Sequence, residues 1–507
     1  MYARVLVLVA FIAHIATSYR YGYFRDELYF IACARHPAWG YVDQPPLVAF
    51  AAWLSAPAGY NIVMLRLLPV LCAALTVWLA ARIARELGGG GFAQAFAALA
   101  TMLLPAYLLL GNTLTTTSFE PLSWTLLIYA LIRLVRTGDQ RYWIGAGFAF
   151  AFGMYGKYSM LLLAAGLFIG LLLTAQRRLL ASRWFFFGAA CALILIAPNL
   201  LWQASHGWAF AQVVSGDFAH RHAFNTGLQL EYRNFVQNAI AFILEQLIYT
   251  NPLSVPLWLG GLLALAFSKR MRDLRFIALA YLVLLVLAIW LEGKGYYIIG
   301  IYAVLLAAGG AAAERYLVNV PLRAAAVTAF LIFTLAFVPL SLPVLPIQTF
   351  ISYSKALHLT GQNGTPAHVI QPVYAEEFGW DELARHVAAV YNALPPDVRS
   401  RTGIFADTYA DAGALDFYGP RYGLPPAISA QNTYYLWGTR NYDGRTLIVV
   451  GATQADIVRR YFRKMTLVAT YGHPYKWIVE GPTPIYLCTD PIVPLGQIWP
   501  HLKWFGA

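Results

Sequence analysis

Long apolar segments recur through the first two thirds of this chain and limit what it can fold into. A helix needs about 20 mostly apolar residues to cross a bilayer. Eleven segments approach that length, give or take one or two, near residues 2–18, 62–84, 92–110, 119–136, 142–156, 158–174, 184–203, 253–268, 275–291, 296–313 and 322–340. The pattern predicts a polytopic α-helical membrane protein whose first segment is a span, with a cleaved signal peptide as the alternative.

The composition favours a membrane protein over other classes. Of the 507 residues, 59% are hydrophobic and 12% are charged, and the mean hydropathy is +0.57. Soluble domains carry about 25% charged residues, so this chain has too little charge to cover a water-facing surface. This argues against a soluble protein, a disordered protein and a nucleic-acid binder, although the isoelectric point is 9.4.

The charges also predict an orientation in the membrane. Residues 1–340 carry 23 Lys and Arg against 12 Asp and Glu, whereas residues 341–507 carry 13 against 12. Basic residues recur at every second helix end, which marks a cytoplasmic face. The first outer loop 19–60, the outer loop 204–252 and the C-terminal residues are then outside. Eight of the twelve acids of residues 1–340 lie on that outer side, which indicates a polar site there: Asp26, Glu27, Asp43, Glu120, Asp217, Glu231, Glu245 and Glu292.

The chain changes character after Pro346. Short β-rich runs alternate with helical patterns and are separated by turn residues. The strands are expected at Thr402–Ala406, Thr446–Val450, Met465–Thr470 and Pro484–Leu487, and the helices at Glu376–Asn392 and Ala455–Lys464. We therefore predict two domains, a transmembrane catalytic domain over residues 1–340 and a periplasmic, extracytoplasmic α/β domain over residues 341–507.

The first outer loop holds the richest pattern of polar residues. Asp26 and Glu27 follow the first apolar segment closely and have aromatic neighbours. One interpretation is a solvated helix start, where carboxylates are stabilised by the helix dipole. The other is a carboxylate held at the membrane surface as a general base. The rigid segment from Asp43 to Leu47, which contains two prolines, is suited to lie over such a site.

These motifs resemble the polyprenyl-phosphate-sugar-dependent glycosyltransferases of the class C fold. That superfamily includes protein O-mannosyltransferases, lipid A aminoarabinose transferases and bacterial galacturonosyl transferases. The resemblance covers most of the chain and rests on Arg25–Phe30, Gly40–Leu47, Asn112–Glu120, Gly156–Ser159, Gly293–Tyr297, Ala410–Gly419 and Asn432–Gly438.

The resemblance implies roles for individual residues. Asp26 would be the catalytic base and Glu27 would help to bind acceptor or donor. The donor phosphate would be bound by Lys294 with Tyr296 or Tyr297, with Arg25 and Lys157 as further candidates, because a leaving phosphate needs cations. Glu120 stands where the family commonly has Asp, and it can instead begin its own helix. Substrate-binding residues are expected at Tyr29, Tyr41, Asp43 and Glu120.

The histidines give no firm metal pattern. His220 and His222 form a His-x-His pair in the outer loop 204–252, but Arg221 lies between them and no cysteine is near. We interpret the pair as part of a solvated loop, with substrate gating by Arg221 or Arg233 as the alternative. No cofactor is predicted with certainty, and a divalent cation is left open.

The leading hypothesis is an inverting glycosyltransferase at the periplasmic face of the bacterial inner membrane. Its partners would be a polyprenyl-phosphate-linked sugar, membrane lipid and a glycolipid, polysaccharide or protein acceptor, and no nucleic acid. The alternative is a transporter or flippase of a lipid-linked substrate, although transporters usually bind near the bilayer midplane in repeated halves. A third hypothesis is a non-catalytic assembly subunit, which the intact Asp26-Glu27 pair disfavours.

Overall fold

The computed structural model describes residues 2–220, 235–358, 370, 372–451, 458–475 and 481–506. The chain forms two compact units. Unit 1 comprises Met1–Tyr19, Val63–Leu201 and Phe224–Val344, and unit 2 comprises Arg20–Ile62, Trp202–Ala223 and Leu345–Ala507. The first outer loop expected from the sequence therefore belongs to the same unit as the C-terminal residues.

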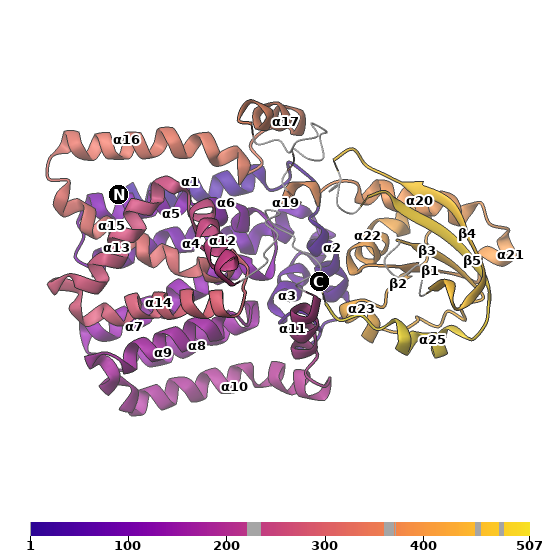
Figure 1. Ribbon diagram of the computed structural model, residues 1–507, viewed down its shortest axis with the longest axis horizontal. Helices are drawn as coiled ribbons and strands as arrows, with labels where there is room; N and C mark the ends of the chain where they lie inside the picture. Colours follow the sequence, from indigo (N-terminus) through magenta and orange to yellow (C-terminus); the bar gives the residue numbers. More distant parts are fainter. Residues whose placement is uncertain are drawn as a thin grey trace. The chain divides into compact units, whose positions relative to one another are not determined.

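Unit 1 is a helical bundle (Figure 1). Its helices are α1 (Tyr2–Thr17), α4 (Ile62–Glu86), α5 (Gly91–Met102), α6 (Pro105–Asn112), α7 (Glu120–Thr137), α8 (Tyr142–Gly156), α9 (Met160–Leu172), α10 (Arg183–Ser205), α12 (Phe235–Thr250), α13 (Val255–Phe267), α14 (Arg275–Trp290), α15 (Tyr302–Tyr316) and α16 (Val320–Phe337). Short 3₁₀ segments join some of them, including η2 (Thr116–Phe119) and η6 (Gly295–Ile301).

The polytopic helical membrane fold is confirmed, but the number of eleven spans is not. Among the described residues, six helices are long and apolar enough to cross a membrane, or up to nine if each of three bent pairs is one span. Helices α1 and α8 lie where spans were expected but have 16 and 15 residues. At 1.5 Å per residue, such helices are shorter than the roughly 30 Å apolar layer.

One expected span is broken for a clear covalent reason. The segment 92–110 folds as α5 and α6, which meet at an angle of 62°. Pro105 is the first residue of α6, where its missing N–H costs nothing. A proline also moves the residue before it out of the helical region, and Leu104 has an extended backbone. The break therefore follows from the proline.

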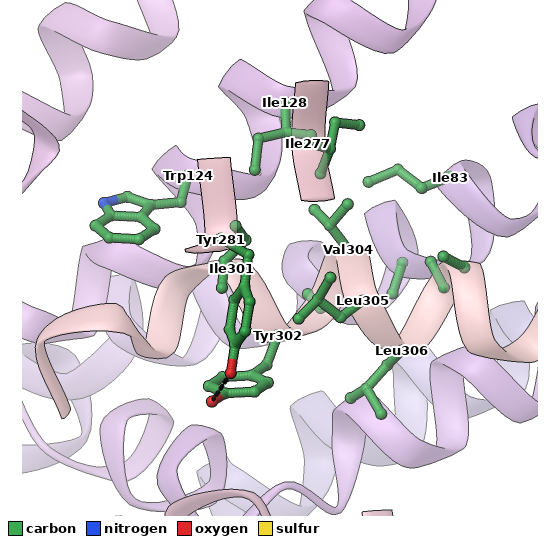
Figure 2. Packing of buried hydrophobic residues seen from close by; sticks show 14 of the residues in the cluster. Ile83, Trp124, Ile128, Ile277, Tyr281, Ile301, Tyr302, Val304, Leu305 and Leu306 are labelled. Atoms are coloured by element: carbon green, nitrogen blue, oxygen red, sulfur yellow. Dashed lines mark hydrogen bonds between the residues drawn. The ribbon is translucent and has the colours of Figure 1, made fainter. Parts of the chain in front are cut away.

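The core of unit 1 is built around η6 and α15. Figure 2 shows Ile83 of α4, Ile128 of α7 and Ile277 of α14 around the side chains of Ile301, Tyr302, Val304, Leu305 and Leu306. All of these side chains are buried. The hydroxyls of Tyr281 and Tyr302 are 3.3 Å apart, so these two buried polar atoms are partners of each other.

Unit 2 combines helices with a five-stranded sheet. The sheet order is β2 (Ala427–Ile428), β1 (Thr402–Ala406), β3 (Thr446–Val450), β5 (Thr483–Pro491) and β4 (Phe462–Tyr471). Strand β1 is parallel to β2 and β3, and the other pairs are antiparallel. The helices are α2 (Arg25–Arg35), α3 (Leu47–Leu54), α11 (Ala209–His220), α17 (Ile347–Ala356), α19 (Pro372–Ala375), α20 (Trp380–Asn392), α21 (Pro396–Arg399), α22 (Tyr409–Tyr418), α23 (Asn432–Leu436) and α25 (Leu495–Leu502).

The sheet is covered on both faces. Figure 1 shows α20 and α22 on one face and α25 on the other. Alternate strand residues point to opposite faces, and Phe405 and Val449 belong to one hydrophobic cluster with Ile498 and Trp499 of α25. The α/β domain predicted for the C-terminal residues is confirmed, together with its four expected strands.

One detail of the expected organisation is wrong. Residues 462–464 were expected to end a helix, but they begin β4, where Phe462 pairs with Pro491. The cross-strand pairing with β5 overrides the local helical pattern. The described residues of the outer loop 204–252 contain α11 and α12, and the position of this segment outside the membrane stays a prediction. Arg221, His222, Glu231 and Arg233 of that loop lie outside the described residues.

Candidate functional site

The first turn of α2 presents Asp26 and fixes it in place. The helix begins at Arg25, so the expected helix start is present, but the burial of Glu27 does not fit a solvated one. Glu27 is fully buried, and its Oε2 atom accepts a hydrogen bond of 2.8 Å from the backbone N–H of Phe24. A carboxylate at this position satisfies an N–H group that the helix leaves without a partner. Glu27 therefore stabilises the helix start that carries Asp26.

The Asp26 carboxylate is oriented through one oxygen. Its Oδ1 atom accepts hydrogen bonds from the Tyr409 hydroxyl at 2.9 Å and from Arg25 Nε at 3.3 Å. Arg25 also forms an ion pair of 2.9 Å with Glu376. The Asp26 side chain is 26% exposed, and its Oδ2 atom has no hydrogen-bond partner in the part of the chain that is described. The carboxylate is held but still open on one side.

Asp43 lies in a second hydrogen-bonded group of the same unit. Its Oδ1 atom is 2.7 Å from the Tyr29 hydroxyl, and its Oδ2 atom accepts from the Asn432 amide at 3.2 Å. The Tyr29 hydroxyl is also 2.7 Å from Thr433 Oγ1. Its single proton can be donated to the carboxylate or to the threonine oxygen. The Tyr29 and Tyr409 rings, 4.7 Å apart, connect this group to Asp26.

Burial changes the protonation of these groups. The pKa of Asp43 is raised to about 7, chiefly because the carboxylate is removed from water. The Tyr29 hydrogen bond acts to lower this pKa, and the Asp26 charge acts to raise it. Burial also raises the pKa of Tyr409 well above its usual value. The Tyr409 hydroxyl therefore remains a hydrogen-bond donor to Asp26 at neutral pH.

Tyr41, which was expected to bind substrate, forms hydrogen bonds with the backbone of nearby residues. It is 1% exposed, and its hydroxyl lies 3.1 Å from the carbonyl oxygen of Cys33 and 3.3 Å from that of His36. Its backbone carbonyl accepts from the Gln203 amide at 3.2 Å. These contacts fix the loop that positions Asp43. Substrate binding by Tyr41 stays a prediction.

Unit 1 holds the other predicted site residues. Lys157 follows α8 in a short turn before α9, and its ammonium donates to Thr117 Oγ1 at 2.8 Å. Its Nζ atom lies 4.7 Å from the ring centre of Tyr296 and 5.0 Å from that of Tyr297. Aromatic faces attract a cation at these distances. Glu120 completes the cluster, with its Oε2 atom 3.7 Å from Lys157 Nζ.

Glu120 begins α7, as the Pro121 at the next position predicted. Its side chain is 1% exposed, and its Oε2 atom also accepts from the Ser159 hydroxyl at 2.9 Å. Its Oε1 atom is buried and has no hydrogen-bond partner among the described residues. We name the group of Thr117, Glu120, Lys157, Tyr296 and Tyr297 the Lys157 cluster.

Lys294 contributes charge to this cluster from an exposed position. It precedes η6 directly and so lies two residues before Tyr296. Burial lowers the pKa of Lys157, the Glu120 charge raises it and the Lys294 charge lowers it. The structure thus brings Glu120, Lys157, Lys294 and the two tyrosines into one neighbourhood in unit 1. A pair of ammonium groups with one carboxylate is suited to an anion such as phosphate.

A metal site has no support from the geometry that is described. No three His, Cys, Asp or Glu side chains of the described residues are grouped so that they could hold an ion. The side chain of His220 and all of His222 lie outside that description.

The sequence did not reveal several partners of the predicted residues. Tyr409 and Glu376 are far from Asp26 and Arg25 in the chain, and Asn432 and Thr433 are equally far from Asp43. One local signal was available, because the segment starting at Asn432 belonged to the family resemblance. The left-handed backbone of Asn432, with φ of 48°, also marks an unusual position.

The comparisons with known proteins agree with this fold. Residues 43–202 match the family model described as dolichyl-phosphate-mannose-protein mannosyltransferase. No curated protein matches the sequence. The crystal structure of ArnT from Cupriavidus metallidurans in the apo state is similar, with a TM-score of 0.61 and 13% identity over 95% of this chain and 97% of that one. The structure of the same protein bound to undecaprenyl phosphate gives a TM-score of 0.60 and 14% identity over the same shares.

The chain therefore has the class C glycosyltransferase fold. The resemblance found in its motifs is confirmed at this level, and the chain is a multi-span membrane protein. The matched segment 43–202 contains Asp43, Glu120 and Lys157.

Proposed function

We propose that this protein is an inverting glycosyltransferase that moves a sugar from a polyprenyl-phosphate donor to a hydroxyl acceptor. The observation that carries the proposal is the Asp26 carboxylate, which Tyr409 and Arg25 orient through Oδ1 while Oδ2 stays available. The donor class is supported by the ArnT structure with undecaprenyl phosphate and by the family model over residues 43–202.

Asp26 acts as the general base in the proposed reaction. Its Oδ2 atom takes the proton of the acceptor hydroxyl, whose oxygen attacks the anomeric carbon of the donor sugar. The bond from that carbon to the phosphate oxygen breaks, and polyprenyl phosphate leaves with the electron pair. Attack opposite the leaving group inverts the anomeric centre through an oxocarbenium-like transition state.

The leaving phosphate needs positive charge, and the Lys157 cluster with Lys294 supplies it in unit 1. Thr117 and the faces of Tyr296 and Tyr297 hold the Lys157 ammonium in place, and Glu120 at 3.7 Å offsets part of its charge, so the exposed Lys294 provides the excess positive charge. Arg25 is a further candidate in unit 2, although its pairing with Glu376 already uses part of its charge.

The acceptor is a glycolipid such as lipid A, a polysaccharide or a protein, and the transferred sugar is a hexose or a pentose. Tyr29 and Asp43 are the proposed acceptor-side groups, because they lie in the same hydrogen-bonded neighbourhood as Asp26. The basic residues at alternate helix ends support an orientation in which Asp26 and residues 341–507 face the periplasm.

The test uses purified protein in lipid with a panel of radiolabelled polyprenyl-phosphate sugars and a membrane glycolipid extract. Transfer of label to an acceptor, together with release of free polyprenyl phosphate, is expected for one donor. Asp26→Asn should abolish this transfer, and Asp443→Asn is its control variant. Asp443 is an exposed aspartate of unit 2 that pairs only with the nearby Arg445 among the described side chains. No transfer from any donor, with labelled lipid still crossing the bilayer, would support the transporter hypothesis instead.

A further inference from the structure

Unit 2 contains a cavity of about 200 Å³ that the proposed reaction does not use. Its wall combines apolar side chains with four polar ones, Arg35, His36, Asp416 and Arg440. Ligand sites are typically lined in this way, with mostly apolar surface and a few placed polar groups. The volume is several times the roughly 30 Å³ that one water molecule occupies in the liquid.

The cavity lies at one end of a pair of parallel helices, and Asp26 lies at the other. Tyr409 at the start of α22 donates to Asp26 at the start of α2. Asp416, near the end of α22, accepts at its backbone carbonyl from Arg35 at the end of α2, with a distance of 2.9 Å. At 1.5 Å per residue, Arg35 is about 14 Å from Asp26 along the helix.

Close packing fixes the two helices against each other. A Cβ atom on Gly413 of α22 would lie 2.9 Å from the backbone of Leu28 and Tyr29 in α2. Only a glycine allows this approach, so the backbones are in direct contact. The spacing between Asp26 and the cavity is therefore rigid.

The carboxylate of Asp416 is fully occupied. Arg440 donates to both of its oxygens, at 3.3 and 2.9 Å. Oδ1 also accepts from the backbone N–H of Ala427, and Oδ2 from the Tyr434 hydroxyl. These four hydrogen bonds match the acceptor capacity of a carboxylate. Asp416 thus cancels the charge of Arg440 and offers nothing more to a ligand.

Arg35 is left as the excess positive charge of the cavity. A guanidinium has five N–H donors, and among the described residues Arg35 uses one of them, on the Asp416 carbonyl. Its guanidinium also lies over the Tyr60 ring at 5.3 Å, which limits its movement without neutralising it. The remaining donors form a planar fork, the geometry that binds a carboxylate or a phosphate group.

The rest of the wall suits a sugar ring. Pro420, Pro425 and Pro426 line the cavity, and the first and last of them are exposed. Proline rings are rigid and present apolar faces without a backbone N–H. They can cover the C–H face of a pyranose while a charged substituent of the sugar reaches Arg35.

We propose that this cavity binds an acidic sugar residue, with its carboxylate or phosphate group on Arg35 and its ring against the prolines. In the proposed function, the bound acidic sugar is part of the acceptor. It lies about 14 Å, measured along α2, from the base Asp26. That assignment rests on the proposed function, whereas binding of the acidic sugar itself does not.

The test is a ligand-observed saturation-transfer NMR titration of the full-length protein in detergent, at low salt and without donor lipid. The probes are D-glucuronate, D-glucose 6-phosphate and D-glucose. Binding of at least one acidic probe is expected, and glucose should bind at least about tenfold more weakly, because it lacks the charge-assisted contact. Glucuronate and glucose 6-phosphate together distinguish a carboxylate from a phosphate ligand.

Arg35→Gln should weaken binding of the acidic probe about tenfold, and Arg35→Lys should retain part of it, since a lysine keeps the charge without the fork. Arg445→Gln, which removes an exposed arginine elsewhere in unit 2, should change nothing. The proposal is overturned if glucose binds as tightly as both acidic probes, or if Arg35→Gln binds like the unmodified protein. Either result leaves the transfer reaction itself untouched, because that reaction is measured with donor lipid.

Discussion

Replacing Lys157 by methionine is expected to destabilise unit 1, because it strands the Glu120 carboxylate in the protein interior. Glu120 is 1% exposed, and Lys157 Nζ lies 3.7 Å from its Oε2 atom. Its Oε1 atom already lacks a hydrogen-bond partner among the described residues. After the substitution, the Ser159 hydroxyl is the remaining donor to this carboxylate that the structure describes.

The size of the effect can be worked from the distance. Two unit charges 3.7 Å apart attract with about 4.5 kcal/mol at an effective dielectric constant of about 20. Removal of one partner of a buried ion pair typically costs about 3–5 kcal/mol. We therefore expect Lys157→Met to lower the free energy of unfolding by about 4 kcal/mol.

The double variant separates the lost charge pair from lost packing. Glu120→Gln combined with Lys157→Met removes both charges, so no buried charge remains without a partner. It should be more stable than Lys157→Met alone by at least about 1 kcal/mol. Lys294→Met is the matched control, since this exposed lysine is expected to change stability by less than about 0.5 kcal/mol.

The assay is equilibrium unfolding in mixed micelles of a mild detergent and SDS, followed by far-UV circular dichroism, for the four proteins. The reasoning is refuted if Lys157→Met unfolds at the same SDS fraction as the unmodified protein. It is refuted equally if the double variant is less stable than Lys157→Met, because removal of the Glu120 charge would then add to the loss of stability and not relieve it.

Three further predictions concern unit 2. Folding raises the pKa of Asp43 from 3.8 to about 7, so between these pH values the folded state binds a proton that the unfolded state has released. The free energy of unfolding should therefore fall as the pH rises from about 4 to about 7. In thermal unfolding experiments, Asp43→Asn should remove this pH dependence. Gly413→Ala should destabilise the protein by about 1–3 kcal/mol through a clash with the backbone of α2, whereas Gly472→Ala, with no atom near its Cβ, should not. Tyr409→Phe removes a hydrogen bond to the proposed base and should lower kcat about tenfold while the KM for donor changes little.

The polytopic helical membrane fold was predictable because long apolar segments are the sequence signal of spanning helices. Helix starts at Arg25 and Glu120 were also predictable, since carboxylates and an early proline are local signals. The number of spans was not, because bends such as the one before Pro105 and short helices such as α8 make length a poor criterion.

The candidate site was predictable only in part. Asp26, Asp43 and Lys157 were found through motifs that lie within short stretches of sequence. Their partners come from distant segments, and Tyr409 is 383 residues from Asp26. Such contacts depend on how unit 2 assembles the first loop with the C-terminal residues, and no local pattern encodes that assembly.

The most direct test of the central claim compares Asp26→Asn with the unmodified protein in the presence of the labelled donor that the panel of polyprenyl-phosphate sugars identifies. Two quantities are measured, the release of free polyprenyl phosphate that depends on acceptor and the binding of donor at equilibrium. The account predicts that Asp26→Asn loses the release while it keeps its fold and most of its donor binding, because the amide cannot accept the hydroxyl proton. An Asp26→Asn protein that still transfers the sugar at a normal rate would contradict the assignment of Asp26 as the base.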